Sequence, residues 1–162
     1  MVAKHHFLAT LLIAPANYYI TTFTIWFGHW FSHLRKGPLT GFHSGHHILY
    51  PNSQNIQSQV FRSGHDRRNS NFALAPWLML TSIVQYFFLP TWIFVVSLTQ
   101  TTLLAIIVGY VHINFHLLHS KLDRFQWFLR ARRLHEVHHD RNMNYMVVDH
   151  FWDRLAGTYA EE

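Results

Sequence analysis

The stretch FALAPWLMLTSIVQYFFLPTWIFVVSLTQTTLLAIIVGYV, residues 72–111, shapes the architecture more than any other part of the chain. These 40 residues contain no charged residue and no histidine. A helix needs about 20 apolar residues to cross the hydrocarbon core of a membrane, so the stretch has the length of two spans. Pro90 stands near its middle, and proline disfavours helical geometry at the residue before it. The sequence therefore predicts a helical hairpin, residues 72–89 and 91–111, that turns at Leu89–Pro90.

A third apolar segment lies upstream of this hairpin. Residues 7–28, FLATLLIAPANYYITTFTIWFG, have the length of one span, and Pro15 and Asn17 predict either a kink within it or two short segments. The chain is 49% hydrophobic, 17% aromatic and only 13% charged, a composition that suits membrane helices with aromatic residues at the interface. We expect a single domain, residues 1–162, with an all-α fold: an integral-membrane helical bundle of about three to four spans.

Charged residues gather in the two segments that flank the hairpin. Of the 13 Lys and Arg residues, 12 lie in residues 34–71 and 112–162, as do all eight Asp and Glu residues. Three spans would put both segments on one side of the membrane, and positive charge marks that side as cytoplasmic. The net charge of +5 then favours anionic lipid headgroups, and no nucleic acid partner is expected.

Two further segments have open interpretations. Residues 34–71 are rich in Gly, Pro, Asn, Ser and Gln and are expected to form a loop or an interfacial segment. Residues 125–139 mix large apolar residues with arginines. They predict either a helix that lies in the membrane interface or an ordinary amphipathic helix packed on the domain.

The 15 histidines concentrate in spaced sets at the ends of the apolar segments. An H-x-x-H-H box occurs twice, and positions i, i+3 and i+4 share one helix face, so each box is predicted to aim three imidazoles at one point. A spaced histidine pair precedes each box. Two matched sets are too many for one metal ion and predict two metals side by side. The candidate ligands are His29, His33, His43, His46, His47, His112, His116, His119, His135, His138 and His139.

The residue types restrict the chemistry. Neutral imidazole binds iron, zinc, copper and nickel, whereas the absence of cysteine excludes thiolate zinc sites and iron–sulfur clusters. Two metals in a histidine shell at the mouth of an apolar bundle suit dioxygen activation beside a lipid, because imidazole resists oxidation and thiolate does not. Asp149 and Asp153 are candidates to hold ligand imidazoles through their second N–H, and Asn144 is a candidate to reach a metal-bound water. Capping, an ion pair or a turn is the alternative for each.

Two rival interpretations use the same residues. His135-Glu136-Val137-His138-His139 also matches H-E-x-x-H, in which Glu136 would be the general base of a zinc protease. That interpretation leaves His138 and the whole first box unexplained. The other alternative is a membrane metal-binding or transport protein. Transport requires polar ligands within the membrane spans, and residues 72–111 contain no charged residue and no histidine.

The order of the boxes, together with the end of the chain, resembles the fatty acid hydroxylase/sterol desaturase superfamily of integral-membrane di-metal oxygenases. The resemblance runs from about His29 to Tyr159, and either His112-x3-His116 or His116-x2-His119 fits the third box. Members commonly close with a similar N-Y … W-D-R-L-F-G-T-Y. The corresponding residues here are Asn144-Tyr145 and Phe151-Trp152-Asp153-Arg154-Leu155-Ala156-Gly157-Thr158-Tyr159.

The resemblance implies a four-helix-like membrane bundle with a cytosolic histidine-rich cap that holds two Fe ions, which Zn can replace on expression. It also implies O2-dependent hydroxylation or desaturation of a lipid such as a fatty acyl chain or sterol. The short chain is similar in length to the carotenoid ring hydroxylases of the superfamily, so that substrate class is an alternative. No flavin, haem or NAD fingerprint is present, so we expect electrons from a ferredoxin or a cytochrome b5-like protein that docks on the basic cytosolic face.

Overall fold

The computed structural model describes residues 2–34, 40–58 and 64–161, and every regular element in these ranges is helical. An isolated bridge between Ser58 and Leu117 is the nearest approach to a strand in this part of the chain. The all-α prediction is therefore confirmed. The elements are α1 (Val2–His33), α2 (Thr40–Leu49), η1 (Ser53–Asn55), α3 (Gly64–Phe88), α4 (Thr91–Phe115), η2 (Lys121–Arg124), α5 (Gln126–Arg141) and α6 (Phe151–Ala156).

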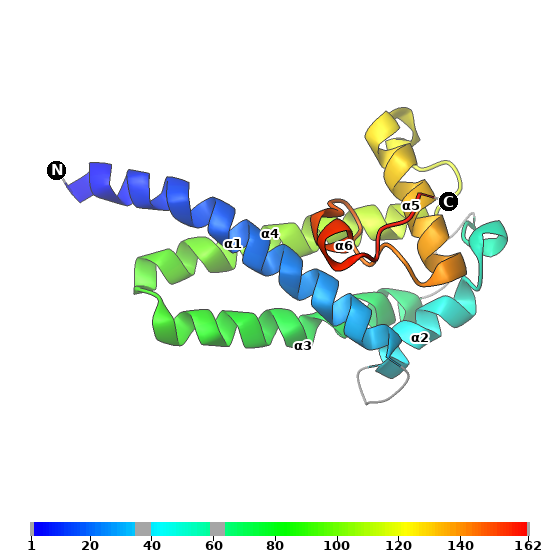
Figure 1. The fold of residues 1–162 in the computed structure, drawn as a ribbon, viewed down its shortest axis with the longest axis horizontal. Helices are drawn as coiled ribbons and strands as arrows, with labels where there is room; N and C mark the ends of the chain where they lie inside the picture. The colour runs from blue at the N-terminus through cyan, green and yellow to red at the C-terminus, as the bar shows by residue number, and fades with distance from the viewer. Residues whose placement is uncertain (1, 35–39, 59–63, 162) are drawn as a thin grey trace.

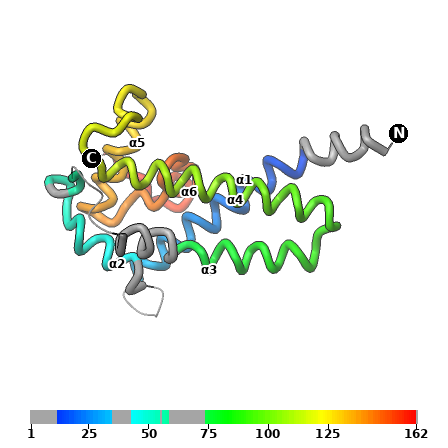
Figure 2. The backbone as a smooth tube through the Cα atoms, turned by 180° about the vertical axis from the view of Figure 1, so that it is seen from behind, coloured from blue at the N-terminus to red at the C-terminus, as the bar shows by residue number. Residues whose placement is uncertain are grey.

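Three long helices form the body of the molecule. α3 and α4 form an antiparallel hairpin, and α1 crosses over both of them (Figures 1 and 2). The hairpin turns at Leu89–Pro90, where the sequence predicted a turn, and the backbone of Pro90 is extended, with φ −54° and ψ 143°. α1 continues through Pro15 to His33 as one helix, so the proline does not divide it into two segments.

A close crossing of α1 and α3 fixes where α1 lies on the hairpin. Gly28 of α1 faces the indole of Trp77 of α3, and a Cβ atom at Gly28 would lie only 2.6 Å from the Trp77 ring. Phe27 and Phe31 pack edge-on against the same indole, with ring centroids 5.1 and 5.2 Å away. The missing side chain at Gly28 thus lets the last two turns of α1 approach the hairpin, and these turns carry two of the candidate ligands.

In the described part of the chain, one helix is long and apolar enough to cross a membrane, namely α4, Thr91–Phe115. The apolar part of α3, Leu74–Phe88, is shorter. One such helix is weak evidence for a membrane protein, so the three predicted spans stay a prediction.

α2, α5, η1 and η2 form a cap at the end of the bundle where α1 and α4 finish (Figure 1). α6 instead packs beside the middle of α1, where the indole of Trp152 donates to the hydroxyl of Thr22. Residues 34–71 were expected to form a loop or an interfacial segment. The loop alternative was wrong for residues 40–49, which form α2, and for residues 64–71, which form the first turns of α3, and the interfacial alternative stays a prediction. Gly41 and Gly45 weaken the local helix signal of α2, and its position on α1 and α3 supplies tertiary contacts that composition does not reveal.

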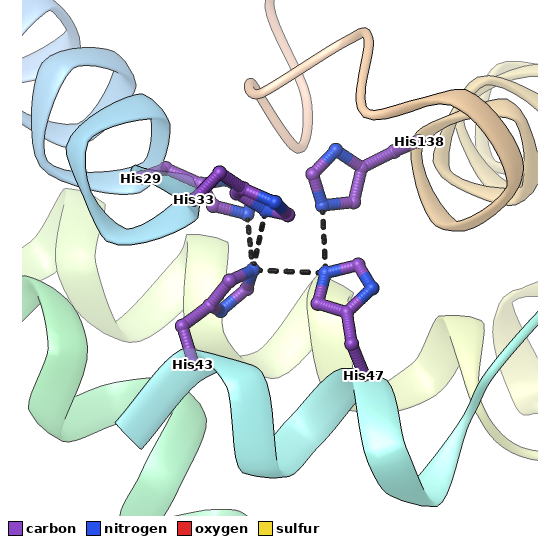
Figure 3. A group of neighbouring side chains, drawn as sticks. All are labelled: His29, His33, His43, His47 and His138. Carbon is purple, nitrogen blue, oxygen red and sulfur yellow. Dashed lines mark hydrogen bonds between the residues drawn. The ribbon is translucent and has the colours of Figure 1, made fainter. Parts of the chain in front are cut away.

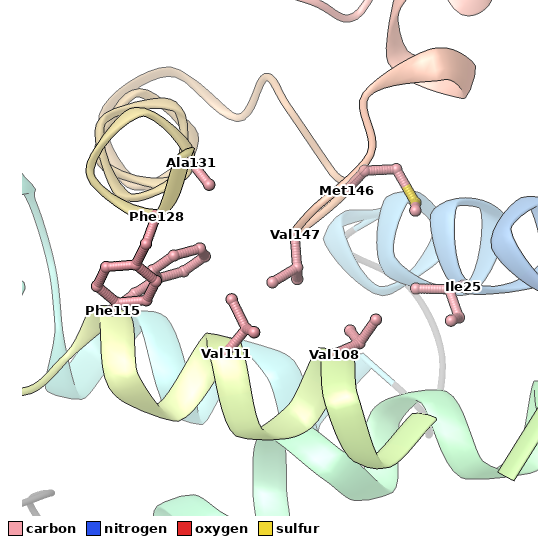
Figure 4. Packing of buried hydrophobic residues seen from close by; sticks show 8 residues of the cluster. All are labelled: Ile25, Val108, Val111, Phe115, Phe128, Ala131, Met146 and Val147. Carbon is pink, nitrogen blue, oxygen red and sulfur yellow. The ribbon is translucent and has the colours of Figure 1, made fainter. Parts of the chain in front are cut away.

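α5 packs on the domain through its apolar face. This is what the sequence predicted for residues 125–139 under the interpretation of an ordinary amphipathic helix. A buried core joins α1, α4, α5 and the segment after α5 (Figure 4), and it consists of Ile25, Val108, Val111, Phe115, Phe128, Ala131, Met146 and Val147. Arg132 is buried beside this core, where its guanidinium donates to the carbonyl of Asn114 and pairs with Asp123. Trp127 stays half-exposed on the outer face of α5.

Candidate metal centre

The cap brings nine of the eleven candidate histidines into two compact groups. The first group is His29, His33, His43, His47 and His138, and the second group is His46, His112, His116 and His135. Within each group, one ring nitrogen per residue lies within 4.8 Å of all the others. The histidine boxes, which are far apart in the sequence, therefore meet as predicted.

Each H-x-x-H-H box is divided between the two groups, which corrects the prediction that its three imidazoles converge on one point. On α2, His43 and His47 belong to the first group and His46 to the second. On α5, His138 belongs to the first group and His135 to the second. Positions i and i+4 are about 40° apart around a helix, whereas i+3 and i+4 are about 100° apart. Each helix therefore lies between the groups and supplies both.

His43 is the centre of the first group (Figure 3). Its Nε2 lies 2.9 Å from the Nε2 atoms of His29 and His33 and 3.0 Å from that of His47. The Nε2 of His47 is in turn 3.2 Å from the Nε2 of His138. α1, α2 and α5 thus each direct at least one imidazole into the same small volume.

The second group lies deeper, between α2, α4 and α5. The Nε2 atoms of His116 and His135 are 3.1 Å apart. The ring of His46 lies 4.8 Å from that of His112 and 4.6 Å from that of His116, measured between centroids. The ring of Tyr50 stacks on His116 at 4.2 Å and is fully buried.

The other two candidates are placed differently. His139 lies between the groups, with its Nε2 3.1 Å from that of His135 and its ring 4.2 Å from that of His47. His119 is exposed, adopts a left-handed backbone conformation with φ 62° and lies outside both groups. Of the two possible third boxes, the structure thus groups His112 and His116.

Backbone carbonyls set the orientation of four imidazoles. His116 Nδ1 donates to the carbonyl of Ile56 at 2.9 Å and His138 Nδ1 to that of Met143 at 2.8 Å. A carbonyl oxygen only accepts, so Nδ1 carries the proton and Nε2 of a neutral ring keeps its lone pair. The same arrangement holds for His139 with Tyr50 and for His29 with Tyr145.

The nitrogen contacts of the first group fit a metal ion better than a hydrogen-bond network. A ring nitrogen carries at most one proton, and His29 Nε2 has only a lone pair, so the three contacts of His43 Nε2 cannot all be hydrogen bonds. A metal–imidazole bond of about 2.0–2.1 Å puts neighbouring ligand nitrogens roughly 3 Å apart. The donor set is all nitrogen, which suits iron or zinc.

Burial keeps these imidazoles neutral, as metal ligands must be. Burial lowers the pKa of His33 from 6.5 to about 4, and burial with the charge of neighbouring imidazoles lowers the pKa of His116 and His139 to about 3. The same causes hold the pKa well below the usual 6.5 for His43, His46, His47, His135 and His138.

Asp153 supports the site through the backbone. Its buried carboxylate accepts hydrogen bonds from the backbone N–H groups of Tyr145 and Met146 and from Nδ1 of His150. Burial acts to raise the pKa of Asp153, but these hydrogen bonds outweigh it and lower the pKa. Asp153 thereby fixes the segment whose Tyr145 carbonyl accepts from His29. It positions a candidate ligand through the peptide, without touching an imidazole of either group.

The two other predicted supporting residues bond elsewhere. Asp149 accepts from the hydroxyl of Tyr18 at 2.7 Å and from the backbone N–H of Phe151. Asn144 is buried, with φ 56°, and its amide bonds the backbone of Leu134 and Ala160, which ties the end of the chain to α5. The structure thus gives Asn144 a structural role in the irregular segment after α5, away from both histidine groups.

Sequence reasoning missed the four carbonyls that orient the imidazoles. They belong to Tyr50, Ile56, Met143 and Tyr145. Every residue type has a carbonyl, so no pattern of side chains marks these positions. Only the paths of the segments around α5 bring them to the histidines.

A cavity of about 780 Å³ connects this centre with the bundle. It lies between α3 and α4 under α1, and its walls include His29 and His43 of the first group and His112 of the second. Away from the histidines most of its wall is apolar. One space with mostly apolar walls therefore reaches histidines of both groups.

Two groups of buried histidines that could each hold a metal ion, at the end of a helical bundle, define a class of protein, and comparison with known families identifies which one. The model of the family named Fatty acid hydroxylase matches residues 14–158, almost the whole chain. The chain belongs to this family, which is part of the fatty acid hydroxylase/sterol desaturase superfamily. No curated protein and no solved structure matches it.

Proposed function

We propose that this protein is a membrane-bound di-iron oxygenase that uses O2 to hydroxylate or desaturate a lipid. The observation that carries the proposal is the apolar cavity that reaches His29 and His43 of the first group and His112 of the second. A substrate in that cavity would present one carbon to both groups. The zinc-protease alternative has no such support, because His135 lies with the second group and the half-exposed Glu136 lies in neither.

Iron bound by the two groups would supply the redox chemistry that activates O2. The residues of the chain contribute position and exclusion of water. The carbonyls of Met143, Tyr145 and Ile56 hold Nδ1–H groups so that Nε2 faces the metals. The apolar cavity holds the lipid in one orientation and keeps water from the reacting carbon.

Membrane integration is part of the proposal. The length and composition of α4, the apolar part of α3 and the exposed apolar side chains of the bundle support it, among them Phe87, Phe88, Ile106 and Tyr110. The histidine cap would face the cytoplasm, where exposed arginines such as Arg133 and Arg141 flank His138 and His139 on α5. These arginines would attract an acidic electron donor of the ferredoxin or cytochrome b5 class.

The decisive experiment combines metal analysis with turnover. Purified protein should contain two iron ions per chain after reconstitution. With a reduced ferredoxin or cytochrome b5 and 18O2, it should oxidise one of three offered lipid classes, namely fatty acyl chains, sterols or carotenoids. Incorporation of 18O, or loss of two hydrogens, would be read by mass spectrometry. One metal per chain together with peptide hydrolysis would overturn the proposal.

A filled cavity provides the matched test. Ala105→Leu adds bulk to the cavity wall halfway along α4, whereas Thr99→Leu adds it on the exposed face of the same helix. We expect Ala105→Leu to lose turnover of long substrates with both metals retained, and Thr99→Leu to behave as the native protein. Equal turnover in the two variants would exclude the cavity as the substrate site.

Membrane orientation has its own test in this cysteine-free chain. Cysteines introduced at Ser53 or Arg133, both in the cap, should react with an impermeant thiol reagent from the cytosolic side. A cysteine at the exposed Thr91, beside the hairpin turn, should react from the opposite side. Labelling of Ser53 and Thr91 positions from the same side would contradict the predicted spans.

A further inference from the structure

The cavity has a second polar end, opposite the histidines. Its wall there contains Ser82 of α3 and Thr101 and Thr102 of α4, and the walls between the two ends are mostly apolar. Thr101 precedes His112 by eleven residues, which separates the polar end from the second group by about 16 Å along the helix. Thr101 is buried, Ser82 is half-buried and Thr102 is exposed. A buried polar group in an apolar bundle is costly and needs a reason.

Two of these hydroxyl groups can only accept from a ligand. Ser82 Oγ donates its proton to the carbonyl of Leu78, and Thr102 Oγ1 donates to that of Leu98, each at 2.8 Å. A hydroxyl has one proton and two lone pairs, so both oxygens present lone pairs to the cavity. The complementary ligand group is a hydrogen-bond donor.

The third hydroxyl is held by a network that joins three helices. Thr101 Oγ1 lies 2.9 Å from Thr21 Oγ1 and 3.5 Å from the amide nitrogen of Asn17. The Asn17 amide donates to Gln100 at 2.9 Å and accepts from Gln85 at 2.8 Å. Side chains of α1, α3 and α4 thereby keep this end of the cavity polar and in a defined shape.

The same region has unused hydrogen-bonding capacity. Gln85 Oε1 and Ser97 Oγ are buried and have no hydrogen-bond partner among the described residues. Gln85 lies one turn beyond Ser82 on α3, and Ser97 lies one turn before Thr101 on α4. Buried polar atoms are rarely left unpaired. Gln85 Oε1 can only accept a hydrogen bond and Ser97 Oγ can donate or accept one, so this region has spare acceptors.

From these contacts we propose that Ser82, Thr101 and Thr102 bind a hydroxyl group of the substrate. The inference rests on the proposed oxygenase function and adds a substrate class to it. The substrate is an elongated apolar lipid that carries a hydroxyl group about 16 Å from the carbon that is oxidised. A lipid without this donor leaves the acceptors unpaired and binds less tightly.

The proposed hydroxyl site is tested with two probes, one whose oxygen carries a proton and one whose oxygen carries a methyl group instead. Binding of 1-hexadecanol and of its methyl ether to the iron-loaded protein in detergent is measured by calorimetry. We expect the alcohol to bind about fivefold to tenfold more tightly, the ratio that one neutral hydrogen bond produces. Equal affinities would overturn the inference, because the ether can only accept.

A double variant assigns the preference to the polar end. Ser82→Ala with Thr102→Val removes two hydroxyls that bond only their own helices, so the network between helices stays intact. We expect the preference for the alcohol to fall to about twofold or less, with unchanged affinity for the ether. The matched control, Thr99→Val, removes a similarly bonded hydroxyl of α4 that is not part of the cavity wall, and it should keep the full preference. A full preference in the double variant would also overturn the inference.

Turnover distinguishes this inference from the proposed function. If the alcohol binds selectively but neither probe is oxidised under any donor, the oxygenase proposal fails and the hydroxyl site stands. If both probes bind and are oxidised equally, the hydroxyl site fails and the oxygenase proposal stands.

Discussion

The two histidine groups have the same ligand chemistry but different surroundings. In the first group, His33 and His47 are only half-buried, because this group lies where α1 ends and the chain leaves the bundle. In the second group all four histidines are buried, and Tyr50 packs across His46 and His116. One box on one helix serves both groups, so exposure is a property of the surrounding packing and not of the motif. We therefore expect a metal bound in the first group to exchange with solvent faster than one bound in the second group.

Loss of a single ligand should have the largest effect. His138→Ala removes a fully buried member of the first group, and we expect activity to fall by more than about 100-fold with the helical fold retained. Metal analysis should show loss from the first group alone. His119→Asn is the control, because His119 lies outside both groups and asparagine tolerates its left-handed backbone. Full activity in His138→Ala would remove the first group from the metal centre.

Chelation should separate the two groups in time. With excess chelator, we expect the metal of the first group to leave at least about tenfold faster than that of the second group. A tenfold ratio corresponds to a difference of about 1.4 kcal/mol in the free energy of local opening around the two groups. His33→Ala should accelerate only the fast phase. Metal release followed by absorbance checks both expectations, and a single phase for both metals would mean that the difference in burial has no consequence.

Asp153→Asn should affect the first group more than the second. An amide keeps one oxygen but sets its NH2 against the backbone N–H of either Tyr145 or Met146, so we expect the free energy of unfolding to fall by about 1–3 kcal/mol. The Tyr145 carbonyl would then hold His29 less firmly, and metal content should drop in the first group. Chemical denaturation and metal analysis measure the two effects. Asp149→Asn, whose partners lie away from the histidines, should leave metal content unchanged.

Glu136→Gln should have the smallest effect. Glu136 lies beside His135 on α5 but belongs to neither group, and burial raises the pKa of its carboxyl. In an oxygenase it does not touch the reacting atoms, so turnover should keep a substantial fraction of the native rate. A zinc protease would need it as the general base. Complete loss of turnover with both metals retained would favour that alternative.

Residue types and their spacing were sufficient to predict an all-α chain, the turn at Leu89–Pro90 and the meeting of the two histidine boxes. Each of these follows from local rules. Forty apolar residues are too long for one span, proline interrupts a helix, and repeated imidazoles need a common metal. The family follows from the same residues, because the order of the boxes and the closing segment can be read along the chain.

Only the tertiary structure decided how the boxes are shared. His46 and His47 are neighbours in the chain, yet they point about 100° apart around α2, and their groups are defined by α1 on one side and α4 on the other. Three further features also depend on contacts between segments that are distant in sequence. They are the helix at residues 40–49, the carbonyls that orient the imidazoles and the polar end of the cavity. Local spacing specifies a direction around one helix, but a site exists only where the packing of several helices brings those directions together.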